Sequence, residues 1–193
     1  MIQTVDVVIL GAGPGGLSAA TALALRGLDV MVVNNGYLMG YGIEGAFKSK
    51  AEFEIARLYA NTALRQDLFT IRSTPDFGAV KRAIERTAKN LSSTITMRLQ
   101  RLGIKLLKGA GFFADSRTVI VGDDIIKAGY IVIATGSVPR VFPGVTVDGS
   151  RVVTSDEIVR LTSLPESLLI LGAGVIGCEF ASIFNELGSK VLL

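Results

Sequence analysis

Three glycines at fixed spacing near the start of the sequence are the first candidates for a binding function. Gly11, Gly13 and Gly16 form the pattern G-x-G-x-x-G directly after the apolar run Val7–Leu10, and an alanine-rich helix is expected to follow. The first glycine permits a sharp turn, the second lets the backbone approach a pyrophosphate, and the third lets the helix lie close to its strand. The helix N-terminus then stabilises phosphate through unpaired N–H groups and the dipole. The alternative is an incidental glycine-rich turn.

The same pattern recurs near the other end of the chain. A strand is predicted over Leu168–Leu171, a helix over Val175–Leu187, and a further strand begins at Val191. Between strand and helix stand Gly172, Gly174 and Gly177. Two such patterns are more specific than one, and they predict that a single chain binds two dinucleotides between which hydride passes.

The acid that dinucleotide-binding folds place at the end of their second strand is replaced by an amide. An Asp or Glu about 20 residues after the glycines usually accepts hydrogen bonds from the ribose, and Asn34 stands there in this chain. An amide oxygen also accepts hydrogen bonds, so we expect a weakened contact. The alternative is a polar strand end followed by an Asn35-Gly36 turn.

Composition excludes several classes of chemistry. The 193 residues contain no histidine, which excludes a His general base, a Ser-His triad and a His-ligated metal, so we expect no metal site. The net charge of +3 comes from interleaved acids and bases, which does not indicate nucleic-acid binding. The single cysteine, Cys178, excludes an internal disulfide and favours a reducing cytoplasm. We predict that Cys178 itself is buried and unreactive.

Apolar residues make up 49% of the chain and the mean hydropathy is +0.49, which suits parallel strands buried on both faces. No window of about 20 residues is both free of charge and compatible with a helix, so no membrane span is expected. The apolar run that begins at Val5 lacks a basic segment before it and contains Asp6, so it does not indicate a signal peptide.

The order of apolar segments predicts an α/β fold with a central parallel sheet and a small β-hairpin or meander. Parallel strands are predicted over Val5–Leu10, Val30–Val33, Ile104–Leu107 and Tyr130–Ala134, a hairpin over Thr118–Val121 and Asp124–Lys127, and helices over Ala46–Leu64, Asp76–Leu102 and Ser155–Leu161. The first strand should lie centrally beside the second. The glycine-rich loop 36–45 permits close approach to a ligand, or is merely flexible. The basic residues of the helix over Asp76–Leu102 are expected to form a solvated face.

With these motifs the chain resembles the pyridine nucleotide-disulfide oxidoreductases, the group that includes dihydrolipoamide dehydrogenase, glutathione reductase and soluble transhydrogenase. The resemblance also rests on Ala134–Ser137, Pro139, Pro143-Gly144, Thr154–Glu157, Leu164-Pro165 and Gly172–Glu179. It implies a Rossmann-like FAD/NAD(P)-binding fold, with an FAD-binding domain over residues 1–150 and the incomplete start of an NAD(P)-binding βαβ unit over residues 151–193.

The resemblance also implies which residues bind each cofactor. For FAD they are Gly11, Gly13, Pro14, Gly15, Gly16, Asn34, Asn35, Lys50, Gly111, Thr135, Gly136 and Ser137. For the nicotinamide nucleotide they are Gly172, Gly174, Val175, Ile176, Gly177 and Glu179. Lys50 would lie beside flavin N5, where a cation favours reduced flavin, and Glu179 would hold it, which makes these two the candidate catalytic residues. The alternative is two unrelated surface charges.

The chain departs from the family at the redox motif. The family's two cysteines fall on Tyr41 and Ala46 and its proline on Lys48, while Ser49 and Lys50 match. Neither Tyr41 nor Ala46 can form a disulfide, so dithiol chemistry is excluded. The family's His–Glu pair, a further flavin-binding segment and its dimer domain would follow residue 193, so a homodimer is expected only if that domain is present.

Two hypotheses follow. The first is an FAD flavoprotein that oxidises NAD(P)H with a small-molecule acceptor other than a disulfide: a quinone, a dye or a second nicotinamide. The second is a truncated, non-catalytic nucleotide-binding or interaction module, which Asn34 favours. The choice between NAD and NADP depends on a residue after the strand that begins at Val191, so it stays open.

Overall fold

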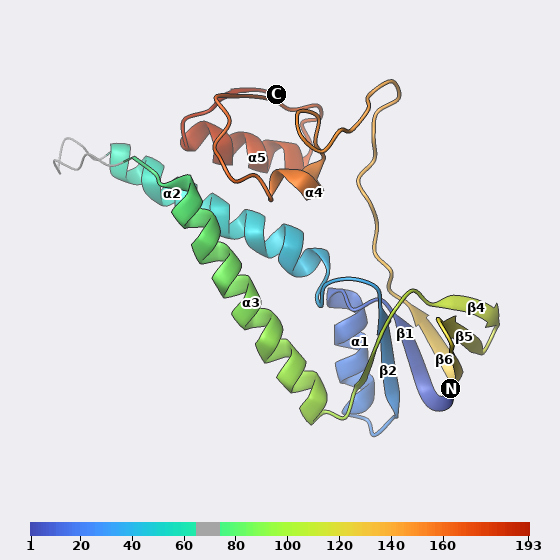
Figure 1. Cartoon of the computed structure of the whole chain (residues 1–193). Helices are drawn as coiled ribbons and strands as arrows, with labels where there is room; N and C mark the ends of the chain where they lie inside the picture. Colours follow the sequence, from blue (N-terminus) through green and yellow to red (C-terminus); the bar gives the residue numbers. More distant parts are fainter. Residues whose placement is uncertain (65–73) are drawn as a thin grey trace. The chain divides into compact units, whose positions relative to one another are not determined.

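A computed structural model describes residues 1–64 and 74–193 (Figure 1). These residues form two compact units, the first of residues 1–44 and 89–138, the second of residues 45–88 and 139–193. The long helix α3 (Phe77–Arg101) contributes residues to both units. The division into domains over residues 1–150 and 151–193 stays a prediction.

The first unit is built on a mostly parallel sheet (Figure 1). Within the described residues its order is β3-β2-β1-β6-β5-β4. The strands are β1 (Ile2–Leu10), β2 (Val30–Asn34), β3 (Lys105–Lys108), β4 (Phe112–Asp115), β5 (Thr118–Val121) and β6 (Asp124–Ile133). Strand β1 runs parallel to both β2 and β6, which confirms the predicted central first strand and the α/β fold class.

Strand β6 differs from the prediction in one respect. The second hairpin strand and the returning strand were expected to be separate, at Asp124–Lys127 and Tyr130–Ala134, but they form one strand that ends at Ile133. It pairs with β1 from Ile2 opposite Ile125 to Leu10 opposite Ile133. Because β1 offers partners along this whole length, the chain does not turn at Gly129. Strand β4, in which every residue is exposed to solvent in part, was not predicted, since it lacks an alternating pattern.

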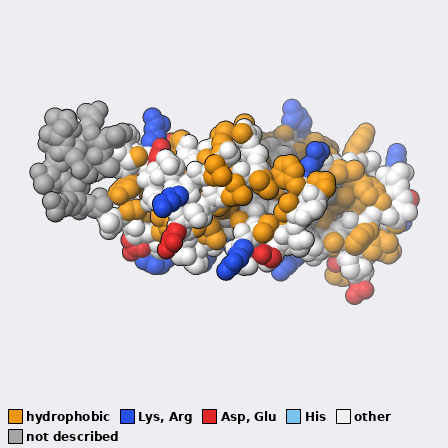
Figure 2. Space-filling view, turned by 90° about the horizontal axis from the view of Figure 1, so that it is seen from above, with side chains coloured by type: hydrophobic (Ala, Val, Ile, Leu, Met, Phe, Trp, Pro, Cys, Tyr) orange, Lys and Arg blue, Asp and Glu red, His pale blue; other side chains and the backbone are white. Residues whose placement is uncertain are grey.

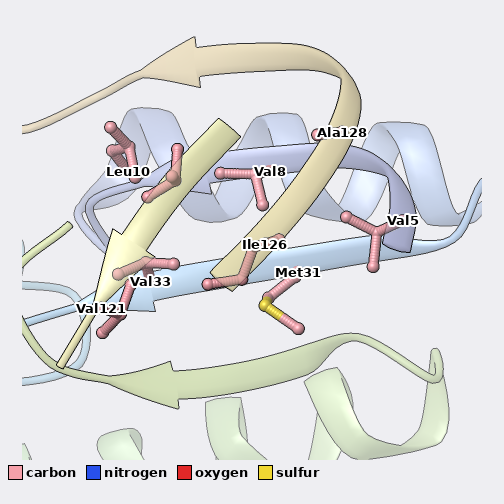
Figure 3. Close-up of a cluster of buried hydrophobic side chains, with 9 residues drawn as sticks. Val5, Val8, Leu10, Met31, Val33, Val121, Ile126 and Ala128 are labelled. Atoms are coloured by element: carbon pink, nitrogen blue, oxygen red, sulfur yellow. The ribbon is translucent and has the colours of Figure 1, made fainter. Parts of the chain in front are cut away.

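Both faces of the sheet are buried along β2 and the second half of β1, which explains the uninterrupted apolar runs there. On one face, Val8, Met31, Val33 and Ile126 belong to a cluster whose side chains Figure 3 shows gathered between the strands. On the other face, β1 and β2 pack against α1 (Pro14–Ala24). The buried sheet fixes where each strand ends, and therefore where the loops that follow can meet a ligand.

Helices dominate the second unit. A short π-helix, η1 (Gly42–Phe47), whose first residues belong to the first unit, leads into α2 (Lys48–Leu64). The helix predicted over Ala46–Leu64 is therefore irregular at its start, and its α-helical part begins at Lys48. The other elements are α4 (Ser155–Ile158), β7 (Ser167–Leu169), α5 (Val175–Glu186) and β8 (Lys190–Leu192), with β7 parallel to β8. Helix α4 ends at Ile158, shorter than the predicted Ser155–Leu161, and it begins with a capping box formed by Thr154 and Glu157.

Aromatic side chains form the core of the second unit. The ring of Phe184 on α5 lies 6.5 Å from that of Phe77 on α3 and 6.4 Å from that of Phe180, measured between centroids. Ala56 of α2 and Ile158 of α4 are buried in the same cluster. Four helices thus share one core, and α2 packs directly against α5.

The surface carries no block of like charge on the face that Figure 2 presents, where basic and acidic side chains are interspersed. Among the described residues, no helix has the length and apolar character needed to cross a membrane.

Candidate functional site

The first glycine turn has the geometry that its sequence predicts. Gly11 adopts a φ of 107°, in the region that favours glycine. A β-carbon on Gly11 would lie 2.2 Å from the carbonyl oxygen of Ala134, and one on Gly16 would lie 1.9 Å from the carbonyl oxygen of Gly11. Both distances are far below van der Waals contact. The close approach of the strand, the turn and the helix therefore requires glycine at these two positions.

Gly13 is different, because a β-carbon there would meet no atom within 4 Å. Gly13 is the N-cap residue of α1, Pro14 opens the helix, and no side chain caps it. The first N–H groups of a helix lack partners within it. The turn thus offers open space and unpaired donors together, which fits a dinucleotide pyrophosphate.

The ends of parallel strands gather further residues of the predicted FAD site in the first unit. The N–H of Gly11 donates to Val33 O at 2.8 Å, and that of Ala134 to Leu10 O at 2.8 Å. The end of β1 therefore lies between Asn34 and Asn35 on one side and the exposed Thr135, Gly136 and Ser137 on the other. The structure brings these predicted residues together at one edge of the sheet, where open α/β sheets bind ligands.

The side chain of Asn34 forms hydrogen bonds with the backbone of its own chain. Its Oδ1 accepts a hydrogen bond from the N–H of Ala12 at 3.1 Å. Its Nδ2 donates to the carbonyl oxygens of Gly36 at 2.8 Å and Tyr37 at 3.4 Å. The amide therefore ties the glycine turn to the loop after β2, and a carboxylate could not make the two donated bonds. This requirement gives a local reason for asparagine at this position.

Gly111 also has a packing role. A β-carbon at this position would lie 2.9 Å from Leu10 Cδ2 and 3.1 Å from Val119 Cγ1. A larger residue there would need the Leu10 and Val119 side chains to shift, so the core of the sheet favours glycine whether or not a cofactor is bound. Its assignment to the FAD site stays a prediction.

The second glycine turn repeats the first. Gly172 has a φ of 115°, and a β-carbon on Gly177 would lie 1.9 Å from Gly172 O, the distance found between Gly16 and Gly11. A β-carbon on the N-cap residue, Gly174, would meet no atom within 4 Å. At the start of α5, Val175 and Ile176 are exposed. The geometry fits a second nucleotide phosphate, although binding itself stays a prediction.

The candidate catalytic residues meet in the second unit. Lys50 Nζ on α2 donates a hydrogen bond to Glu179 Oε2 on α5, and the two form an ion pair. The Lys50 side chain is 63% exposed, whereas that of Glu179 is 14% exposed. Among the described residues, the buried Glu179 Oε1 has no hydrogen-bond partner. The pair presents a cation to solvent above a largely buried carboxylate.

Cys178 was expected to be buried, and this expectation is wrong. The side chain is exposed on α5, and its Sγ lies 3.4 Å from the carbonyl oxygen of Ala173. The apolar residues around it in the sequence suggested a core position. The buried face of α5 instead comprises Phe180, Ile183 and Phe184, which leaves Cys178 on the opposite side.

Comparison with known proteins identifies the family of the chain. Residues 5–193 match the family described as pyridine nucleotide-disulphide oxidoreductase, and the chain belongs to this family. It is 36% identical to the soluble pyridine nucleotide transhydrogenase of Mycobacterium tuberculosis over 204 residues, covering 96% of this chain and 42% of that protein. It is 35% identical to the dihydrolipoyl dehydrogenase of Chlamydia pneumoniae, covering 99% of this chain and 42% of that one.

A solved structure of the HOCl-induced flavoprotein disulfide reductase RclA from Escherichia coli superposes with a TM-score of 0.85 at 26% identity. It is matched over 98% of this chain and 42% of its own length. The chain therefore spans less than half of the curated relatives named here and of RclA.

Proposed function

We propose that the protein is an FAD flavoprotein that oxidises NADH or NADPH and passes the electrons to an acceptor other than an active-site disulfide. The observation that carries the proposal is the Lys50–Glu179 ion pair, retained in a chain whose single cysteine, Cys178, lies on α5. Tyr41 and Ala46 stand where the resemblance places the redox cysteines. Chemistry that needs a dithiol is thereby disfavoured.

The proposed cofactors follow from the two glycine turns. FAD would place its pyrophosphate at Gly13–Gly16, and the nicotinamide nucleotide would place its own at Gly174–Gly177. When bound, FAD would supply the hydride chemistry: NAD(P)H would be oxidised to NAD(P)⁺, and its two electrons and one proton, with a second proton from solvent, would reduce a quinone to a quinol. This chain's own contribution is to bind the phosphates at two helix N-termini and to supply the Lys50 cation.

The proposed role of Lys50 is electrostatic. A fixed ammonium favours any bound group that gains negative charge during the reaction, and Glu179 keeps that ammonium in one place. The ion pair costs no rearrangement at the moment of reaction, because it is formed in advance. We propose the reducing cytoplasm as the compartment, and a homodimer for the protein that carries the family's dimer domain.

The experiment is a spectrum followed by rapid mixing. The protein in its full encoded length should show the absorption of bound oxidised flavin. Anaerobic mixing with NADH or NADPH should bleach it, and a quinone should restore it. Steady turnover with lipoamide should stay at background. A purified protein without flavin, or one that turns over lipoamide, would contradict the proposal.

A second candidate is a module that binds a nucleotide without turnover. The engagement of Asn34 within the chain supports it, because an amide tied to Ala12 and Gly36 is less available to a ribose. This candidate expects nucleotide binding in titration calorimetry, with no bleaching of flavin by either nicotinamide.

A further inference from the structure

The second unit contains a further ion pair, and this one is buried. Glu52 on α2 is 1% exposed, and its Oε1 accepts a hydrogen bond from Lys81 Nζ on α3. The side chain of Lys81 is 15% exposed. Burying such an ion pair costs desolvation free energy, and the pair often contributes little net stability. Stability alone therefore does not explain why the pair is present.

Lys81 is fixed on three sides. Besides Glu52, its Nζ donates to the carbonyl oxygen of Val159 at 2.9 Å. The same atom lies 5.0 Å from the centroid of the Phe77 ring. One ammonium thus joins α2, α3 and the residue that follows α4. A hollow of about 300 Å³ opens beside it, with Ile84 and Leu161 in its wall.

These contacts connect the buried ion pair to the two helices that carry Lys50 and Glu179. Glu52 stands two residues after Lys50 on α2. Phe77, under Lys81, packs against Phe184, which stands on α5 five residues after Glu179. An apolar contact alone can slide along a helix, whereas the hydrogen bonds of the Lys81 ammonium tie it to Glu52 and to Val159 O at the same time. The buried pair therefore fixes α2 against α3, and Phe77 of α3 carries this placement to α5 through its contact with Phe184.

We propose that Glu52 and Lys81 are positioning residues that hold Lys50 Nζ against Glu179. The proposal deepens the proposed function, since it names the residues that keep its catalytic cation in place. The ion pair between Lys48 Nζ and Glu85 Oε2, at 2.7 Å, also joins α2 to α3, but the Glu85 side chain is 48% exposed, so this pair is less buried than that of Glu52 and Lys81. Burial raises the pKa of Glu52 and lowers that of Lys81, while Lys48 lies close enough to act on both.

The test is a zero-length crosslink, which needs neither flavin nor turnover. A water-soluble carbodiimide activates the Glu179 carboxyl, the Lys50 amine displaces it as an isopeptide bond forms, and the carbodiimide leaves as a urea. The yield of this crosslink in the full-length protein is measured by mass spectrometry of the joined peptides. It reports directly on whether the two groups touch.

The variant E52L/K81M replaces the buried pair with apolar side chains of similar size. We expect a folded protein by circular dichroism, with a crosslink yield at least about fivefold below that of the unsubstituted protein. R82Q is the matched control, because Arg82 follows Lys81 on α3 but is 74% exposed and lies 3.8 Å from Asp76. Its yield should stay within about twofold.

A folded E52L/K81M protein with an unchanged yield would overturn the proposal and leave the pair a feature of the core. If that variant does not fold, E52M/K81L takes its place, since it also removes both charges and the hydrogen bond but divides the apolar volume differently between the two positions. The same two outcomes then apply. A protein without bound flavin would refute the proposed function, yet the crosslink would still decide the role of Glu52 and Lys81.

Discussion

At the scale of single residues, the two kinds of glycine in the first turn have separable roles. Gly16 is required by packing, since its added β-carbon would lie 1.9 Å from Gly11 O, whereas Gly13 faces open space. The backbone at Gly13, with φ −73° and ψ 179°, is one that any residue adopts. Stability and nucleotide binding should therefore respond to different substitutions.

We expect G13V to fold with a melting temperature close to that of the unsubstituted protein, but to lose FAD, because the valine fills the space for the pyrophosphate. G16V should fail to fold, since backbone would have to move. Thermal melts and the ratio of flavin to protein absorbance measure the two effects. Normal FAD content in G13V would show that the pyrophosphate is bound elsewhere.

Asn34 gives a second prediction at this scale. In N34D, a carboxylate would face the carbonyl oxygens of Gly36 and Tyr37, to which Nδ2 now donates. The free energy of unfolding should fall by about 0.5 to 1.5 kcal/mol, the usual net contribution of a hydrogen bond, because Gly36 and Tyr37 are exposed and water can reach their carbonyl oxygens. Urea titration measures it, with N35D at the neighbouring exposed residue as the control.

If N34D proved as stable as N35D, the loop would not depend on the amide. Flavin affinity should change only modestly in N34D, because either side chain offers an oxygen to a ribose.

At the scale of elements, the buried pair between α2 and α3 makes stability depend on pH. Burial raises the pKa of Glu52 above 4.5, so its contribution to stability is complete below pH 4.5 and is lost as the pH rises through the folded-state pKa. Burial lowers the pKa of Lys81 below 10.5, so its contribution is complete above pH 10.5 and is lost as the pH falls through the folded-state pKa. Between the two folded-state values, both charged groups cost stability.

We therefore expect E52L alone to lower the free energy of unfolding at pH 7 by about 3 to 5 kcal/mol, because it leaves Lys81 buried and unpaired. E52L/K81M should be as stable as the unsubstituted protein, or more stable by about 1 to 4 kcal/mol. The difference in free energy of unfolding between E52L/K81M and the unsubstituted protein should shrink toward pH 4.5 and toward pH 10.5. Denaturant titrations across this range measure it, and a constant difference would contradict the sign assigned to either group.

The elements also show what the sequence could and could not reveal. The glycine spacing and the apolar runs were sufficient to predict β1, β2, α1 and the second turn, because they reflect local backbone geometry and burial on both faces. The continuity of β6 could not be predicted, since it depends on pairing with β1. The lysine and glutamate of the buried pair are separated in sequence by 29 residues and read as ordinary surface charges. The sequence carried no signal for the pair, since the burial of Ala56, one helical turn after Glu52, is seen only in the structure.

At the scale of the whole molecule, the family is established, whereas its chemistry in this protein is a proposal. The Lys50–Glu179 pair supplies the fixed charge that the proposed hydride transfer needs, and such a transfer needs no thiol. The relatives are longer proteins, so the whole protein's turnover has to be measured in its full encoded length.

The final prediction concerns that turnover. K50A should slow the reduction of bound flavin by NAD(P)H by about tenfold to a hundredfold, because removing one preorganised electrostatic contact typically costs about 1.4 to 3 kcal/mol. The dissociation constant of the nucleotide should change much less, since the phosphates are held at Gly174–Gly177. K50R, which keeps a cation opposite Glu179, should recover most of the rate. Stopped-flow bleaching at several nucleotide concentrations separates the two quantities, and full-rate reduction in K50A would remove Lys50 from the chemistry.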